Sequence, residues 1–215
     1  DGGAYAFTIS PKPDSVTIFN GTYTPAATGL GIYVYGVQVE AAGFATSFIP
    51  TVSAAATRSA DVATMIGNNF SNWYNQTAGT LAVTADASAN SFTTYVAATN
   101  GVTAQNSVYI DNDTGNMRAV YYSGSTAVAT LLLGAVGTVG ALTKIATAYA
   151  VNDFAASRNG GTVATGTGAL PVALTQLNIG ADPAGVATQY VDGHVKAISY
   201  YNGRLTDAQI QALTA

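Results

Sequence analysis

The acidic side chains are where catalytic chemistry would be sought first, and the sequence has few of them. Its 215 residues include 11 Asp and Glu together, and the one glutamate is Glu40. A glycosidase needs two carboxylates about 5 Å apart, or a wider pair for an inverting mechanism. Asp111 and Asp113 share one face of an expected strand, because strand side chains alternate, but they stand beside a hairpin turn. We therefore predict that the chain is not an enzyme and has no catalytic residues.

The stretch DNDTGN, residues 111–116, carries oxygen ligands of the kind that Ca²⁺ prefers. Asp111, Asp113 and Asn116 would supply them. A third acid and the distal glutamate of an EF-hand are missing, and a tight turn explains the same residue types. Asp182 and Asp192 flank the loop ADPAGVATQYVDG and form a second acidic pair with the same two interpretations. Calcium is thus the one cofactor that the sequence leaves open, and none other is predicted.

Aromatic and amide side chains gather in ways that suit sugar binding. A sugar stacks its C–H face on an aromatic ring, while its hydroxyls need donors and acceptors. The stretch NNFSNWYNQ and the pairs YYSGS and SYYNG make the predicted glycan contacts Trp73, Tyr74, Asn75, Tyr122 and Tyr201. The competing interpretation is structural: adjacent tyrosines on a strand point to opposite faces, so one of each pair belongs to the core. We expect Trp73 at the start of a strand, and this position favours a role in the core over a role as ligand platform.

Other functional classes find little support. The sole histidine, His194, has no nucleophile on a G-x-S-x-G elbow, and GAVGTVG has the wrong spacing for phosphate binding. A net charge of −4 with 7 Lys and Arg offers no basic stripe for nucleic acid or for an anionic membrane. The apolar stretch 131–151 holds three glycines and Lys144. It predicts two strands around a glycine-rich turn, without membrane insertion.

The elements that must position these residues are predominantly strands. Turn residues recur about every ten positions, which is typical of an all-β sandwich. We expect antiparallel strands in GTLAVTADA, SFTTYVAAT, NSVYIDND, NMRAVYYSG, ALTKIATAYAVND, FAASRNGGTVATG, LTQLNIGAD and GHVKAISYYN. The chain closes with a single expected helix, LTDAQIQALTA, in which Thr206 and Gln209 form a capping box and Leu205, Ile210 and Leu213 form the apolar side. The predicted fold is an antiparallel β-sandwich with one short C-terminal helix.

Composition changes sharply after Pro50. The strand-like stretch GIYVYGVQVE ends in SFIP and is followed by the small-residue tract TVSAAATRSAD. We therefore expect residues 1–50 to be the last strands of an N-terminal β-module, 51–60 to be a linker and 61–215 to be a complete second domain. Because the sequence starts at Asp1 without a Met or a signal peptide, we also expect a fragment or a processed product.

Residues 58–215 resemble the laminin-G-like, concanavalin A-like jelly-roll family. The resemblance rests on NFSNWYNQTAGTLAV, KIATAYAVNDFAASRNGG, LNIGAD and the closing VDGHVKAISYYNGRLTDAQIQALT. The stretch from Gln38 to Thr51, followed by Arg58, Ala60 and Asp61, resembles the junction after a galactose-binding-like or carbohydrate-binding-module sandwich in bacteriophage tail and virion proteins. In that setting Glu40 serves structure at the edge of the module.

The resemblance implies a non-enzymatic module of a virion surface or tail appendage. It would bind host-surface glycan, or act as structural decoration, beside other virion proteins or in a homo-oligomer such as a trimer. The implied location is the virion surface or the extracellular space. Two alternatives remain open: a carbohydrate-binding module of a secreted bacterial protein, and a polysaccharide-degrading jelly-roll enzyme, against which the single glutamate argues.

Overall fold

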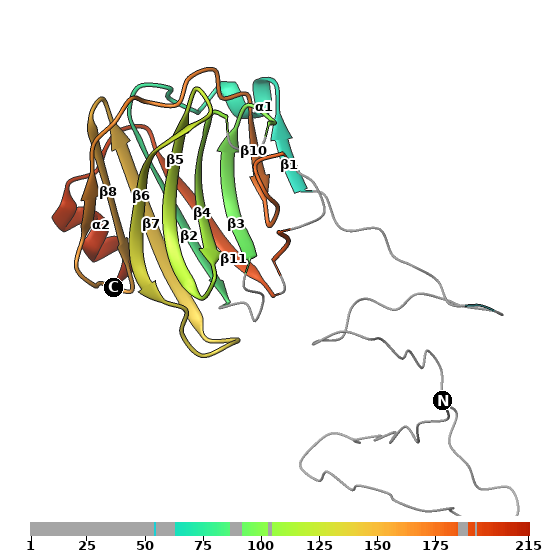
Figure 1. The fold of residues 1–215 in the computed structure, drawn as a ribbon, viewed down its shortest axis with the longest axis vertical. Helices are drawn as coiled ribbons and strands as arrows, with labels where there is room; N and C mark the ends of the chain where they lie inside the picture. Colours follow the sequence, from blue (N-terminus) through green and yellow to red (C-terminus); the bar gives the residue numbers. More distant parts are fainter. Residues whose placement is uncertain (1–53, 55–62, 87–91, 103–104, 185–188, 192) are drawn as a thin grey trace, which may run out of the picture. The chain divides into compact units, whose positions relative to one another are not determined.

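The computed structural model describes residue 54 and residues 63–86, 92–102, 105–184, 189–191 and 193–215. Its strands form two antiparallel sheets that face each other (Figure 1). Sheet A runs in the order β1 (Ala63–Ile66), β10 (Gln176–Ile179), β3 (Phe92–Thr99), β4 (Ser107–Asp113), β5 (Asn116–Ser123) and β6 (Thr126–Ala135). Sheet B runs in the order β11 (Val195–Tyr201), β2 (Gly79–Asp86), β7 (Leu142–Ala150), β8 (Asp153–Arg158) and β9 (Ala164–Gly166). The predicted antiparallel sandwich is confirmed.

Alternation of side chains builds the core between the sheets. On β2 the buried side chains Leu81, Val83 and Ala85 alternate with partly exposed ones. On β5 the ring of Tyr121 crosses the core and stacks on Phe154 of sheet B, with ring centroids 4.2 Å apart and planes at 10°. Its hydroxyl donates to the carbonyl of Ala148 at 3.1 Å. A buried polar tip thus finds its partner in the opposite sheet, which ties the two sheets together.

Helix α2 (Asp207–Thr214) covers the outer face of sheet B. Thr206 accepts a hydrogen bond from the backbone N–H of Gln209, and the Gln209 side chain accepts one from the backbone N–H of Thr206, so the predicted capping box is confirmed. The buried Ile210 packs on a cluster of alanines from β7 and β8: Ala146, Ala148 and Ala155. These small side chains let the helix lie close to the sheet.

The hairpins follow from their turns. Strands β4 and β5 pair Asp113 with Asn116, and between them Thr114 and Gly115 take positive φ values of 49° and 82°. Both central residues are left-handed, as a tight two-residue hairpin requires. The stretch 131–151 is likewise two strands, because β6 ends at Ala135 and β7 begins at Leu142. None of the described helices has the length and apolar character needed to span a membrane.

Two elements escaped the sequence prediction, β1 and the short helix α1 (Asn68–Ser71), and β9 was not separated from β8 within the expected stretch FAASRNGGTVATG. Trp73 also differs from expectation, since it lies in the turn after α1 and does not start a strand. The predicted N-terminal module 1–50 and, apart from Ala54, the linker 51–60 lie outside the described residues, as does Glu40. That division of the chain stays a prediction.

Candidate binding face of sheet A

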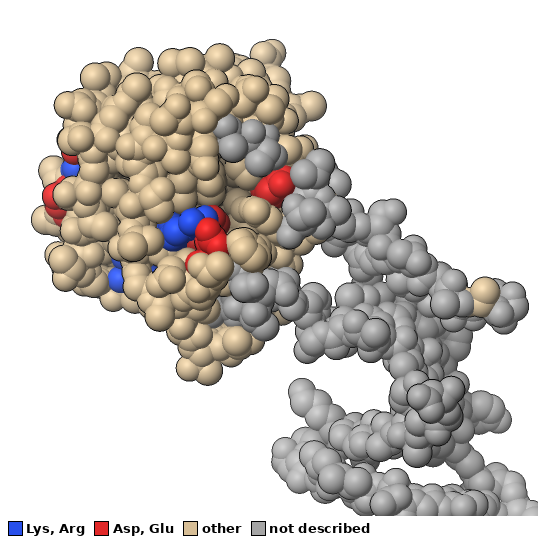
Figure 2. Space-filling view, in the orientation of Figure 1, with Lys and Arg blue, Asp and Glu red and all other residues tan. Residues whose placement is uncertain are grey.

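The outer face of sheet A carries a charged cluster among uncharged neighbours. Because Ile110 points into the core, Tyr109, Asp111 and Asp113 point outward from β4. Register pairs Asp111 with Arg118 on β5, so their side chains stand on the same face. Figure 2 shows this face as largely uncharged, with a group of blue and red side chains near its centre and a separate red patch toward one edge.

Arg118 is held by both carboxylates. Its Nε donates to Asp111 Oδ1 at 3.0 Å, and one terminal nitrogen donates to Asp111 Oδ2 at 2.5 Å. The other terminal nitrogen forms an ion pair with Asp113 Oδ2. The Asp111 side chain is only 5% exposed, whereas those of Arg118 and Asp113 are 21% and 23% exposed. Such a forked pairing fixes the guanidinium in one orientation.

Burial and charge act against each other within this cluster. Burial raises the pKa of Asp111, and the hydrogen bonds and charge of Arg118 oppose that shift. Burial lowers the pKa of Arg118, but the two aspartates more than offset this, so its pKa is raised and the guanidinium stays charged. Burial and then the charge of Asp111 raise the pKa of Tyr109, which therefore keeps its proton.

Tyr109 and Tyr122 form an aromatic pair beside the ion cluster. Their ring centroids lie 6.2 Å apart and their planes at 14°. Both rings are half-buried, and they come from neighbouring strands, β4 and β5. A third flat group between them would need about 7 Å, twice the usual contact distance of about 3.5 Å. The 6.2 Å separation therefore leaves no room for a flat group to insert between the two rings.

The other half of this face, over β10 and β3, is covered by the chain itself. Asn178 is fully buried and its amide donates to the carbonyls of Asp182 and Pro183, at 2.8 and 3.2 Å. Thr94, also buried, donates through its backbone N–H and its hydroxyl to Gln189, at 3.0 and 3.1 Å. The part of the face that remains open lies over β4, β5 and β6.

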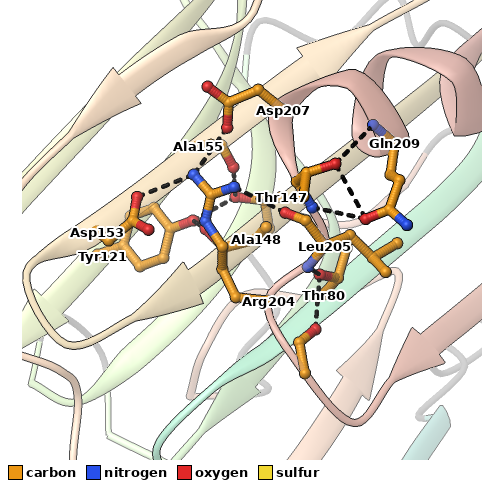
Figure 3. A network of polar contacts seen from close by, with 12 residues as sticks. Thr80, Tyr121, Thr147, Ala148, Asp153, Ala155, Arg204, Leu205, Asp207 and Gln209 are labelled. Atoms are coloured by element: carbon orange, nitrogen blue, oxygen red, sulfur yellow. Dashed lines mark hydrogen bonds and ion pairs between the residues drawn. The ribbon is translucent and has the colours of Figure 1, made fainter.

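A second arginine, Arg204 on the side of sheet B, also pairs with two aspartates, but its contacts are structural (Figure 3). Arg204 bonds Asp153 at 2.8 Å and Asp207 at 2.7 Å, and it also donates to the carbonyl of Leu205. Leu205 in turn donates its backbone N–H to Thr80 Oγ1. Arg204 therefore anchors the chain between β11 and α2, and its contacts explain its presence without a ligand.

The structure separates the predicted glycan residues. Trp73 and Tyr74 belong to an aromatic cluster at one end of the sandwich, where Tyr74 stacks on Phe70 at 4.6 Å and Trp73 meets Tyr200 edge-on at 4.8 Å. The indole N–H of Trp73 donates to the Asn69 carbonyl at 2.6 Å. Burial raises the pKa of Tyr74. This cluster closes the core, and the prediction that it also contacts a glycan remains untested.

The remaining predicted contacts divide in the same way. The Asn75 side chain accepts from the backbone N–H and the hydroxyl of Thr77, at 2.9 and 2.8 Å, which is a local turn. Tyr122 lies on the outer face of sheet A, whereas Tyr201, 38% exposed, lies on β11 of sheet B. In both tyrosine pairs the first residue faces the core, as alternation predicts.

The predicted calcium ligands meet a different partner. A guanidinium lies against both Asp111 and Asp113, while Asn116 is exposed at the turn. Asp182 is buried and Asp192 lies outside the described residues. Within the described part of the chain, no group of three or more His, Cys, Asp or Glu is placed to hold a metal ion. Calcium binding stays an untested prediction.

His194 is exposed and pairs with Asp86, Nδ1 to Oδ2 at 2.8 Å, and Lys196 Nζ lies 3.4 Å from the other Asp86 oxygen. This histidine therefore joins the end of β2 to β11. Sequence reasoning missed Tyr109 and Arg118 as site residues. The signal was present, because the two-residue turn at 114–115 fixes the register that places both on the face of Asp111.

These features define the chain as a jelly-roll β-sandwich with an ordered ion cluster on the outer face of one sheet. The sequence matches none of the protein-family models and none of the curated proteins. Among solved structures it is similar to the CBM40 of the Ruminococcus gnavus IT-sialidase bound to α2,3-sialyllactose, with a TM-score of 0.53 and 15% identity over 65% of this chain and 84% of that one. Domains LG4-5 of the mouse laminin α1 chain superimpose with a TM-score of 0.52 and 13% identity, over 68% of this chain and 40% of that one. At such identities the likeness shows the fold alone.

Proposed function

We propose that this chain is a non-enzymatic carbohydrate-binding module that holds a saccharide on the open part of the outer face of sheet A. The observation that carries the proposal is the pairing of Tyr109 and Tyr122 with the fixed ion cluster of Asp111, Arg118 and Asp113. The rings offer an apolar platform for sugar C–H groups, and the cluster offers charged acceptors for hydroxyls. The solved carbohydrate-binding module of similar fold supports the same class of ligand.

Binding is favoured over catalysis by the state of the carboxylates. A general acid must direct a proton at the glycosidic oxygen, and its partner must be free to act as base or nucleophile. Both oxygens of Asp111 instead face donors of Arg118, and Asp113 is held by the same side chain. The described residues thus offer this pair as a fixed acceptor, although burial raises the pKa of Asp111.

The proposed setting is the extracellular space, on the surface of a virion or a tail appendage. Support for the virion comes from the resemblance at residues 38–61, and the bacterial module of similar fold supports the alternative of a secreted protein. Immunodetection of the chain in purified particles would support the first setting, and detection only in the culture supernatant would support the second. Sedimentation of the full chain would test the proposed homo-oligomer, with a trimer as the expected form.

A glycan array with the full chain tests the binding proposal, in buffer with Ca²⁺ and in buffer with EDTA. Tyr122→Ala should weaken binding of every bound glycan about tenfold, because it removes one ring of the pair, with about 0.5–1.5 kcal/mol of ring contact in addition to its buried area. Tyr201→Ala is the matched control: it removes an exposed tyrosine from β11 of the other sheet. Unchanged thermal unfolding must accompany both variants.

The outcomes separate the competing sites. Loss of binding in Tyr201→Ala but not in Tyr122→Ala would move the site to sheet B and overturn the proposal. Binding that disappears in EDTA would revive the predicted calcium site. A chain that binds no glycan in either buffer would act as structural decoration only.

A further inference from the structure

We propose, building on the proposed function, that this face selects neutral saccharides and discriminates against acidic ones such as sialosides and uronides. The inference starts from the arginine. Arginine recognises a carboxylate ligand by presenting two parallel N–H donors in its planar fork. In this chain the Nε edge of Arg118 already donates to both oxygens of Asp111, so that fork is occupied from within the protein.

All three guanidinium nitrogens of Arg118 are engaged by the two aspartates. The remaining terminal nitrogen of Arg118 is paired with Asp113. An incoming carboxylate would have to displace one aspartate and leave it without its counter-ion. For Asp111 that displacement is especially unfavourable, because its side chain is 5% exposed and an unpaired charge there has little contact with water.

The charge of the cluster points the same way. One guanidinium and two carboxylates carry a net charge of −1, and the whole chain carries −4. An anionic sugar therefore meets repulsion on approach and finds each guanidinium nitrogen of Arg118 already paired with an aspartate. A neutral sugar meets carboxylate oxygens that accept its hydroxyl protons, in charge-assisted hydrogen bonds stronger than those between neutral groups. Neutral ligands match this surface and acidic ones do not.

The fold alone would suggest a different ligand. The structurally similar Ruminococcus gnavus module is bound to α2,3-sialyllactose in one structure and to α2,6-sialyllactose in another. This chain has a similar fold, but its ion cluster favours uncharged saccharides. The prediction is thus specific to Asp111, Arg118 and Asp113 and does not follow from the jelly roll.

The experiment compares matched neutral and acidic probes by isothermal titration of the full chain. Pairs suited to this are lactose with α2,3-sialyllactose and a neutral tetrasaccharide with its uronic-acid counterpart, together with the best neutral binder from the array. We expect at least about tenfold tighter binding of the neutral member. The preference should shrink at high salt, because salt screens the repulsion of the acidic probe by exposed charges.

Asp113→Ala provides the sharper readout. It frees the terminal nitrogen of Arg118 and makes the cluster neutral, while Asp111 still holds the guanidinium. The ratio of acidic to neutral affinity should rise at least about fivefold. The matched control is Asp153→Ala, which removes a partner from Arg204 on the other sheet and changes the net charge of the chain by the same amount. That variant should leave the ratio unchanged.

The possible failures are distinguishable. If no saccharide of either kind binds, the proposed function falls and the selectivity falls with it. If saccharides bind but the acidic member binds as tightly as its neutral partner, the function stands and the selectivity is wrong. An equal rise of the ratio in Asp113→Ala and Asp153→Ala would assign the discrimination to overall charge and overturn the role of this cluster.

Discussion

Arg118→Met should destabilise the protein strongly at neutral pH and much less in acid. Methionine keeps the unbranched aliphatic part of the side chain but removes every donor to Asp111, whose side chain is 5% exposed. Breaking a fully buried ion pair by removing one partner costs about 3–5 kcal/mol. Since Arg118 and Asp113 are 21% and 23% exposed, water reaches part of the gap. We therefore expect a loss of about 2–3 kcal/mol at neutral pH.

The pH dependence follows from the carboxyl group that is left behind. Without Arg118, only burial and the charge of Asp113 act on Asp111, and both raise its pKa. An acid whose pKa is raised by folding binds more protons in the folded state, so stability falls as pH rises through the window above the unfolded value of 3.8. The penalty of Arg118→Met is thus complete above the raised pKa and disappears as pH falls toward the unfolded value.

Urea unfolding followed by circular dichroism, at about pH 7.5 and about pH 4.5, measures this penalty relative to wild type. The double variant Asp111→Asn/Arg118→Met removes both charges, so it should recover most of the stability at neutral pH. A penalty in Arg118→Met that is equal at both pH values would refute the reasoning. So would a double variant that is as unstable as Arg118→Met, because the loss would then come from packing and not from an unpaired carboxylate.

Three further changes test other parts of the fold. Gly79→Ala should lower the free energy of unfolding in urea by about 2–4 kcal/mol, because the new Cβ would lie 2.5 Å from the Tyr149 hydroxyl and displace its hydrogen bonds to Asn75 and Tyr200. A loss under about 0.5 kcal/mol would show that these hydrogen bonds adapt. Thr206→Ala should cost about 1 kcal/mol, or about 2–4 °C in thermal midpoint, through the lost helix cap, with Thr206→Ser as the control that keeps it. The hydrogen bond from His194, and then Lys196, lower the pKa of Asp86, so the stabilisation by this carboxylate is complete above pH 3.8 and is lost as pH falls through the depressed pKa. In Asp86→Asn the free energy of unfolding should therefore depend less on pH in that acidic range, and an unchanged pH dependence would contradict this.

Local sequence rules predicted the parts of the fold that local forces decide. Alternation located β2, and the left-handed pair Thr114 and Gly115 located the β4–β5 hairpin with its register. The elements that were missed or not separated lack such signals. β9 is three residues long, with a central threonine and a terminal glycine, and α1 is four residues long without a side-chain cap. They form because neighbouring strands and core side chains supply their contacts, which no local pattern records.

The candidate site was predictable only in part, for a related reason. Alternation and register together place Tyr109, Asp111 and Arg118 on one face, so the composition of the cluster was available from the sequence. The sequence did not reveal which faces of the two sheets remain open to solvent. That depends on α2 lying on sheet B and on the contact of Asn178 with the carbonyl of Asp182, both of which join segments through the folded chain. Trp73 packs against the core at the end of the sandwich, as the structural interpretation of its sequence context expected.

The ion cluster is informative because stability alone does not explain it. A buried or half-buried ion pair contributes little net free energy, since desolvation of its charges offsets their attraction, and apolar side chains of similar size are often as stabilising. On sheet B the equivalent outer surface is filled by alanines under Ile210, which shows how this fold covers a face when only packing is required. On the open part of sheet A, the chain instead fixes Arg118 between two carboxylates beside two parallel tyrosine rings. A rigid and polar arrangement of this kind is suited to contacting a polar partner from solution, and the pairing of all three guanidinium nitrogens with aspartates is the basis of the proposed preference for a partner without charge.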